Sequence, residues 1–219
     1  MKNYLKFFAL ALFALGAVQK AAAVNVTIDS SAMSIGYMNV FDTANNYQWG
    51  SGWGINDLRA SYSGSLLTVQ PNTNCWAPGD AYWVAGGVGQ KIMEANIFAE
   101  NADSATVGLL NFSGQTVSNT LAAGYSAVAF IKAINPGNGW SMDVFQSAAL
   151  IGGQAFSVSY DFTGVNGLIV QYGIMTRGLV SDPNVDNGSA VVTVPEPSSA
   201  ALMGLGLAGL LAFRLRRKV

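Results

Sequence analysis

The middle of the chain, from residue 24 to residue 194, is dominated by apolar and polar residues that alternate in short runs. Alternation with a period of two is typical of strands that bury one face, and Gly, Asn and Pro residues separate the runs as turns do. The clearest run covers residues 155–162, and a second one follows Asn166-Gly167 at residues 168–174. Because Asn-Gly is preferred in type I′ turns, the pattern predicts a β-hairpin over residues 155–177.

Comparable runs predict a second hairpin, in which residues 58–62 and 65–69 flank Ser63-Gly64. The segment 91–100 predicts a strand less clearly, because its apolar residues also fit one face of a short helix. Further strands are predicted at residues 33–41, 92–99, 105–112, 125–134, 141–146 and 189–194. About ten short strands in one segment predict an all-β domain, a two-sheet antiparallel β-sandwich of jelly-roll type.

The first 23 residues differ from this pattern. Lys2 and Lys6 precede an apolar run at residues 7–18. Gln19-Lys20 and then the small residues 21–23 follow it. A basic start, a short apolar run and a small-residue site are the three parts of a signal peptide, with cleavage expected at Ala21 and Ala23. Since the run is shorter than the roughly 20 residues that span a bilayer, a signal peptide over residues 1–23 is favoured over a retained membrane anchor.

The segment 195–219 is a second exception, built from three parts. In order, these are Pro195, Glu196 and Pro197, an apolar run at residues 200–213, and the basic residues Arg214, Arg216, Arg217 and Lys218. A helix over the apolar run measures about 21 Å at ~1.5 Å per residue, short of the ~30 Å hydrocarbon core. Basic residues stay on the cytoplasmic side, so this tail predicts a transmembrane helix that leaves the middle domain on the far side.

This three-part tail resembles the PEP-CTERM sorting signal of Gram-negative bacteria in order and spacing. The resemblance implies export through the general secretory pathway, recognition by an integral-membrane exosortase, cleavage near Pro195-Glu196-Pro197, and delivery to the cell surface or an exopolysaccharide matrix. A permanent tail anchor is the alternative. The middle domain is similar to a β-sandwich region of PEP-CTERM proteins from verrucomicrobial and related bacteria, which implies a jelly-roll fold like that of sugar-binding modules. The residues that carry this similarity are 36–41, 50–54, 91–96 and 170–173.

Composition limits the chemistry of the middle domain. The chain has no histidine, and Cys75 is its single cysteine. This removes the commonest general base, the usual nucleophile pairs and any intrachain disulfide, and Cys75 is expected to be buried, with intermolecular pairing as the alternative. No catalytic residue, cofactor or metal site is predicted. A secreted hydrolase that uses Glu94 and Glu100 as a glycosidase pair is the least favoured interpretation.

The charge of the middle domain also limits which molecules it is expected to bind. Residues 24–194 contain four cations and eleven carboxylates, a net charge of −7. Nucleic acid is therefore not an expected partner, because phosphate binding needs clustered Lys and Arg. Four carboxylates lie in loops with Gly or Asn, where a solvated surface is favoured over calcium binding: Asp42, Asp57, Asp80 and Asp182.

Four of the five tryptophans, Trp49, Trp53, Trp76 and Trp83, lie within one Gly-rich stretch. Exposed aromatic rings stack on sugar rings, which makes these four residues candidate glycan-stacking residues, and the alternative is that they fill the core. We therefore expect a non-enzymatic surface or matrix protein that associates with extracellular polysaccharide. A structural or adhesive protein that binds other proteins is the rival interpretation.

Overall fold

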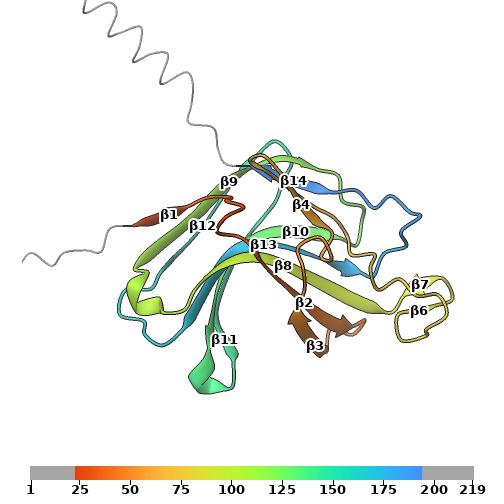
Figure 1. Cartoon of the computed structure of the whole chain (residues 1–219), viewed down its shortest axis with the longest axis horizontal. Helices are drawn as coiled ribbons and strands as arrows, with labels where there is room; N and C mark the ends of the chain where they lie inside the picture. The colour runs from red at the N-terminus through yellow and green to blue at the C-terminus, as the bar shows by residue number, and fades with distance from the viewer. Residues whose placement is uncertain (1–22, 194–219) are drawn as a thin grey trace, which may run out of the picture.

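The structure is a computed structural model that describes residues 23–193, and strands make up most of that part of the chain. Two sheets of six strands pack against each other, and β6 (Val84–Ala85) and β7 (Val88–Gly89) form a separate small hairpin at one end of the molecule (Figure 1). Two short 3-10 helices, η1 (Ser104–Thr106) and η2 (Pro136–Asn138), lie in connections. The all-β prediction is confirmed.

The first sheet, sheet A, is built around β9. Leu110 of β9 pairs with both Val24 of β1 and Tyr160 of β12, so β1 and β12 lie on opposite edges of β9. β14 pairs with β9 on the same edge as β1, and it then pairs with β5, which pairs with β4. The strands of sheet A are β1 (Val24–Val26), β4 (Ala60–Ser63), β5 (Leu66–Val69), β9 (Leu109–Asn119), β12 (Ala155–Asp161) and β14 (Ala190–Thr193).

The second sheet, sheet B, has the strand order β11-β10-β13-β8-β2-β3, with antiparallel pairing throughout. In sheet A, by contrast, β1 runs parallel to β9, so the prediction of purely antiparallel sheets is wrong at this pair. The strands of sheet B are β2 (Ile35–Asp42), β3 (Tyr47–Gly52), β8 (Lys91–Asn101), β10 (Ser126–Asn135), β11 (Ser141–Ala149) and β13 (Ile169–Leu179).

The inner faces of the two sheets share one hydrophobic core. Phe112 of sheet A is fully buried, and its ring lies 5.3 Å from that of Tyr172 of sheet B and 5.4 Å from that of Phe156. Burial of one such side chain contributes about 1.5–3 kcal/mol. The aromatic contact between Phe112 and Tyr172 therefore helps to hold the two sheets together.

The hairpin predicted over residues 155–177 is wrong. β12 pairs with β9 in sheet A, whereas β13 pairs with β10 and β8 in sheet B. Gly167 has a positive φ of 75°, but Asn166 does not have the positive φ that a type I′ turn needs. The Asn-Gly pair therefore does not decide which strands pair. Each of the two strands pairs with strands from elsewhere in the chain, so the chain crosses from sheet A to sheet B between them.

Most other predicted strands agree with the structure. The hairpin of β4 and β5 is confirmed, with Gly64 at φ 60° between the strands, and the segment 91–100 is strand rather than helix. The strand predicted at 105–112 starts too early, because Asp103 accepts a hydrogen bond from the amide of Ala105 and caps η1 before β9 begins. Sequence reasoning did not predict β1, β3, β6 or β7.

The flanking segments lie largely outside the described residues. This holds for the signal helix predicted over residues 1–23, except for Ala23 itself, and for the transmembrane helix of the tail at 195–219. Between residues 23 and 193, no helix has the length and apolar character needed to cross a membrane. The jelly-roll type of the sandwich stays a prediction.

Candidate functional site

The four tryptophans of the aromatic stretch, Trp49, Trp53, Trp76 and Trp83, are all half-buried. Each packs against the main core without being enclosed by it. The indole nitrogen of Trp53 donates a hydrogen bond to Ser51 Oγ at 2.8 Å. These residues therefore extend the core and leave part of each ring at the surface, and glycan stacking by them stays a prediction.

The structure brings two of these tryptophans together beside the edge strand β3. The rings of Trp49 and Trp83 are perpendicular with centroids 6.0 Å apart, and Tyr82 stands perpendicular to Trp83 at 5.0 Å. Trp49 Nε1 donates to the Tyr82 hydroxyl at 3.0 Å, and Lys91 Nζ lies 4.0 Å from the centre of the Tyr82 ring. We call Trp49, Tyr82, Trp83 and Lys91 the aromatic edge.

A turn holds the aromatic edge in place. Asp80 accepts a hydrogen bond from the amide of Tyr82 at 2.8 Å, and its carbonyl accepts one from the amide of Trp83 at 3.0 Å. Short polar side chains fix turns in this way. Tyr82 is left 39% exposed, so it is the residue of the aromatic edge that offers the most ring surface to a ligand.

A second group of side chains lies on the outer face of sheet B, which points away from the main core. The strand register places neighbouring side chains in rows across the sheet. One row contains Phe145, Lys132, Gln171 and Glu100, and the next contains Phe130, Gly173 and Phe98. We call Phe98, Glu100, Phe130, Lys132, Phe145 and Gln171 the outer-face site. Of these residues, sequence reasoning named Glu100 alone as a candidate site residue.

Lys132 is buried in the outer-face site, with 8% of its surface exposed. Its ammonium group lies 4.9 Å from the centre of the Phe130 ring and 5.4 Å from that of Phe98, and it donates to Asn96 Oδ1 at 3.3 Å. Burial lowers the pKa of Lys132 to about 8, against the opposing effect of Glu94 and Glu100. The charge of Lys132 is therefore held where water reaches it poorly.

Gln171, the cross-strand neighbour of Lys132, is 5% exposed. Its Nε2 donates to Glu100 Oε2 at 2.7 Å. A carboxylate accepts hydrogen bonds and does not donate them, so this contact fixes which way the amide points. The opposite atom, Gln171 Oε1, is buried and has no hydrogen-bond partner among residues 23–193. The outer-face site thus contains a buried acceptor that is unsatisfied.

Further along the same face, the polar groups are satisfied. Arg177 Nε lies 3.1 Å from Glu94 Oε2, and Asn39 Nδ2 donates to Glu94 Oε1 at 3.0 Å. Arg177 also donates to Asn45, and its guanidinium lies 5.0 Å from the centre of the Phe41 ring. This network ties β2, β8 and β13 together, in contrast with the unsatisfied acceptor of Gln171.

The structure does not bring Glu94 and Glu100 together as a glycosidase pair. Both project from the outer face of β8, six positions apart on one strand. At ~3.3 Å per residue this separates them by about 20 Å, beyond the roughly 5–9.5 Å that glycosidase carboxylates need.

The carboxylates that were predicted to lie in loops include two that stabilise turns. Asp42 accepts from the amide of Asn46, and Asp182 accepts from the amide of Asn184, each at 2.8 Å. The hydrogen bonds to Asn46 lower the pKa of Asp42. Within the described part of the chain, no group of three or more metal-ligating side chains occurs.

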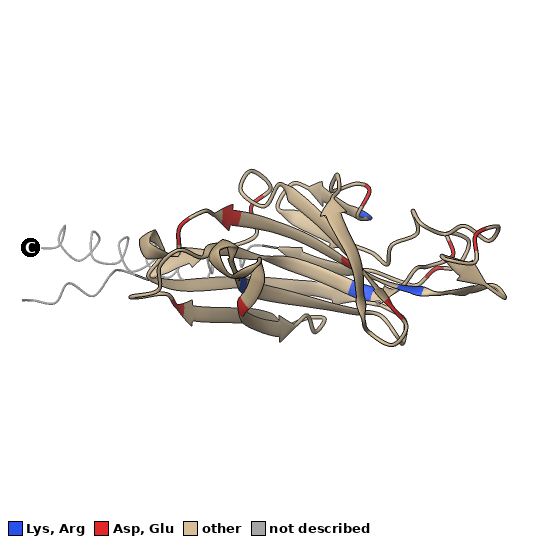
Figure 2. Cartoon of the chain, turned by 90° about the horizontal axis from the view of Figure 1, so that it is seen from below, with Lys and Arg blue, Asp and Glu red and all other residues tan. Residues whose placement is uncertain are grey.

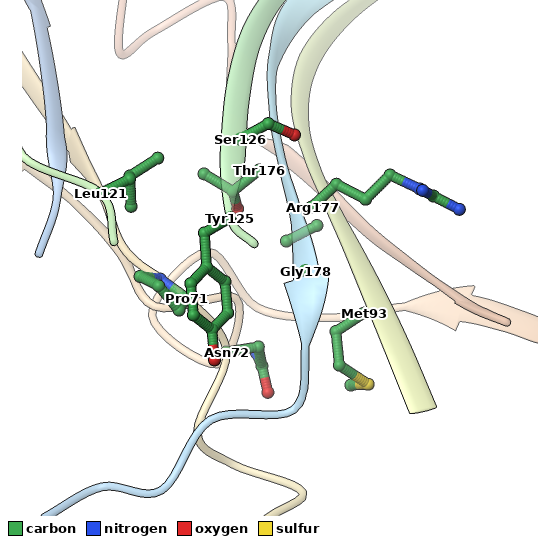
Figure 3. Close-up of a pocket in the computed structure, with 10 residues that line it drawn as sticks. Pro71, Asn72, Met93, Leu121, Tyr125, Ser126, Thr176, Arg177 and Gly178 are labelled. Carbon is green, nitrogen blue, oxygen red and sulfur yellow. The ribbon is translucent and has the colours of Figure 1, made fainter. Parts of the chain in front are cut away.

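Two cavities lie elsewhere in the molecule. The larger one, of about 310 Å³, is a polar cleft between loops, lined by Arg59, Gln70, Thr73, Asp186 and their neighbours. The smaller one measures about 10 Å³ and lies where the Tyr125 ring packs beside Pro71 and Asn72 (Figure 3). Its volume suits at most one water molecule.

Comparison with known proteins identifies the tail. Residues 193–218 match the PEP-CTERM protein-sorting motif, a match that includes Pro195, Glu196 and Pro197 and the basic residues up to Lys218. No curated protein and no solved structure matches the chain. The motif is the recognition signal of exosortase, so this is an exported protein that an exosortase sorts.

The sorting residues themselves lie outside the described residues, as does Ala21 of the expected signal cleavage site. Ala23, the other residue of that site, is exposed and directly precedes β1. The removal of a signal peptide therefore stays a prediction.

Proposed function

We propose that the sandwich associates with extracellular polysaccharide at the cell surface or in an exopolysaccharide matrix, without catalysing a reaction. The observation that carries the proposal is the aromatic edge, where Tyr82 presents an exposed ring on a rigid support. Sugar rings have apolar C–H faces that stack on such rings, and stacking contributes roughly 1 kcal/mol per ring.

The support of Tyr82 favours binding because it is formed before a ligand arrives. Its ring packs against Trp83, and its hydroxyl accepts the hydrogen bond from Trp49. Lys91 is not part of this support, because it lies over the ring face itself. A side chain that is already ordered loses little entropy on binding. A sugar would displace Lys91, whose flexible side chain can move aside.

Two predicted processing steps support the proposed location. A signal peptide over residues 1–23 would direct the domain through the inner membrane, and cleavage near Pro195-Glu196-Pro197 would release it from the membrane. Recognition of the tail by an exosortase agrees with this order of events.

Glycan-array binding by the full chain, purified in detergent, tests the proposal. We expect binding to at least one polysaccharide class, and we expect Tyr82→Ala to weaken it about fivefold, the equivalent of ~1 kcal/mol. Tyr47→Ala is the matched control, since Tyr47 is 57% exposed and lies outside the aromatic edge. Absence of binding to every glycan would refute the proposed function, and equal loss in both variants would refute the role of the aromatic edge.

Protein binding is the second candidate function. Trp140, which directly precedes the edge strand β11, and Met142 in that strand are 67% and 58% exposed. Exposed apolar residues on an edge strand suit contact with another protein. A chain that binds no glycan, and whose adhesion to cells of the same strain falls on Trp140→Ala, would favour this candidate.

A further inference from the structure

The outer-face site contains two buried polar groups with unused hydrogen-bonding capacity. An ammonium has three donors, and Lys132 uses one of them on Asn96 Oδ1 at 3.3 Å. Gln171 Oε1 is an acceptor without a partner in the described chain. Leaving the buried Gln171 Oε1 unpaired is costly, and Lys132 has donors to spare, so the two groups together suit a bound molecule that both accepts and donates hydrogen bonds.

The side chains around these groups are aromatic. Phe145 is the cross-strand neighbour of Lys132 on the outer side, is 40% exposed, and stacks on Phe130 with an interplanar angle of 24°. A buried water needs two to four polar partners. The combination of these polar groups with the exposed ring of Phe145 offers, in addition, an apolar surface that a water does not use. It matches a ligand that has an apolar face and hydroxyl groups.

We propose that the outer-face site is a second sugar-binding subsite, which takes an uncharged polysaccharide. One sugar hydroxyl accepts a hydrogen bond from Lys132 Nζ and another donates to Gln171 Oε1, while the sugar ring stacks on Phe145. Because Lys132 is 8% and Gln171 5% exposed, side chains of the site must move apart for the sugar to reach them. This step rests on the proposed association with polysaccharide and adds a place and a ligand class to it.

Charge decides for a neutral sugar over an acidic one. Gln171 is held by Glu100, so a carboxylate borders the subsite, whereas Glu94 lies further along the same strand and is paired with Arg177. The carboxylates of the domain lie in strands and loops on several sides of the molecule, and cations are few (Figure 2). The net negative charge of the domain disfavours the approach of a carboxylated sugar, against the attraction of the single Lys132 ammonium, and it does not act on a neutral hydroxyl group.

Affinity electrophoresis with the full chain, purified in detergent, tests the subsite. The probes are three uncharged polysaccharides, mixed-linkage β-glucan, xyloglucan and galactomannan, and two acidic ones, alginate and polygalacturonate. We expect retardation by an uncharged probe, and we expect Gln171→Leu and Phe145→Ala each to weaken it at least fivefold. Gln146→Leu is the matched control, because Gln146 is an exposed glutamine on the same sheet, and it should change binding less than twofold.

The outcomes separate the subsite from the proposed function. Retardation of the wild type that Gln171→Leu and Phe145→Ala leave unchanged would overturn the subsite alone, and would mean that Gln171 binds only a structural water. Retardation by the acidic probes alone would also overturn it. Absence of retardation by any probe would count against both proposals. Because Phe145 is 40% exposed and Gln171 is 5% exposed, Phe145→Ala should destabilise the fold less, and its result stands, with the melting temperature as a check, even where Gln171→Leu lowers that temperature.

Discussion

Lys132 offers a test of the electrostatics of the outer face. Burial lowers its pKa from 10.5 to about 8, and each pKa unit corresponds to about 1.4 kcal/mol between the two protonation states. The charged side chain therefore destabilises the folded domain by about 3 kcal/mol at pH 7 relative to an uncharged one. The unfolded chain binds the proton more tightly than the folded chain, so the free energy of unfolding rises with pH between about 8 and 10.5.

Lys132→Met removes the charge and keeps a long apolar side chain. Raising the pH from 7 to 9.5 should stabilise the wild type by about 2 kcal/mol relative to the Met variant, as measured by the free energy of unfolding. Urea unfolding of the full chain in detergent, followed by tryptophan fluorescence, measures it, with Ser147→Ala as a control on the same face. If this difference stays constant with pH, the inference that burial lowers the pKa of Lys132 is wrong.

Three further predictions concern the fold, the cysteine and the tail. Gly173→Ala should destabilise the domain by about 1–3 kcal/mol in thermal unfolding, because an added Cβ meets the carbonyl oxygen of Ile97. The control Gly79→Ala should have little effect, because there is open space around Gly79. Equal effects of the two substitutions would contradict this. Burial raises the pKa of Cys75 to about 11, so alkylation by iodoacetamide at pH 8 should be about 100-fold slower in the folded chain than in urea, and similar rates would contradict it. Mass spectrometry of the native surface fraction should find chains that end near residues 195–197; peptides from residues 203–214 still attached would count against processing, and a strain without exosortase should accumulate the uncut form.

Local alternation predicted strands well where one face is wet. In β12, Phe156 and Val158 are buried while Ser157 and Ser159 are exposed, and the sequence shows this directly. Alternation does not reveal which strand is the partner, because that depends on residues far away in the chain. For this reason the pairing of β12 with β9 replaced the predicted hairpin.

The outer-face site was missed for a related physical reason. A lone lysine in a strand suggests a solvated face, yet residues 129–133 of β10 are buried without interruption. Consecutive buried positions indicate a strand that is covered on both faces, and the apolar run around Lys132 was the available signal. The side chains that cover Lys132 are Phe98 and Phe145. They lie on other strands, and the sequence alone does not show that these strands are near Lys132.

The sorting tail was readable because it is a linear signal. Its recognition depends on the order of the Pro-Glu-Pro triplet, apolar run and basic end, and on no tertiary contact. The aromatic edge was partly predictable, less so than the sorting tail and more so than the outer-face site. The clustering of Trp49, Tyr82 and Trp83 was visible in the sequence, but their contacts with one another and with Lys91 required the fold.

The position of β14 restricts how the sorting enzyme can reach its target. Thr193, the last residue of β14, pairs with both Leu66 and Gln115, and the sorting motif begins at this same residue. A cut near Pro195 leaves about two residues of linker, roughly 7 Å of extended chain. The folded sandwich would then have to rest almost against the enzyme during cleavage, so the shape of sheet A near β14 would itself help to decide whether the chain is accepted as a substrate.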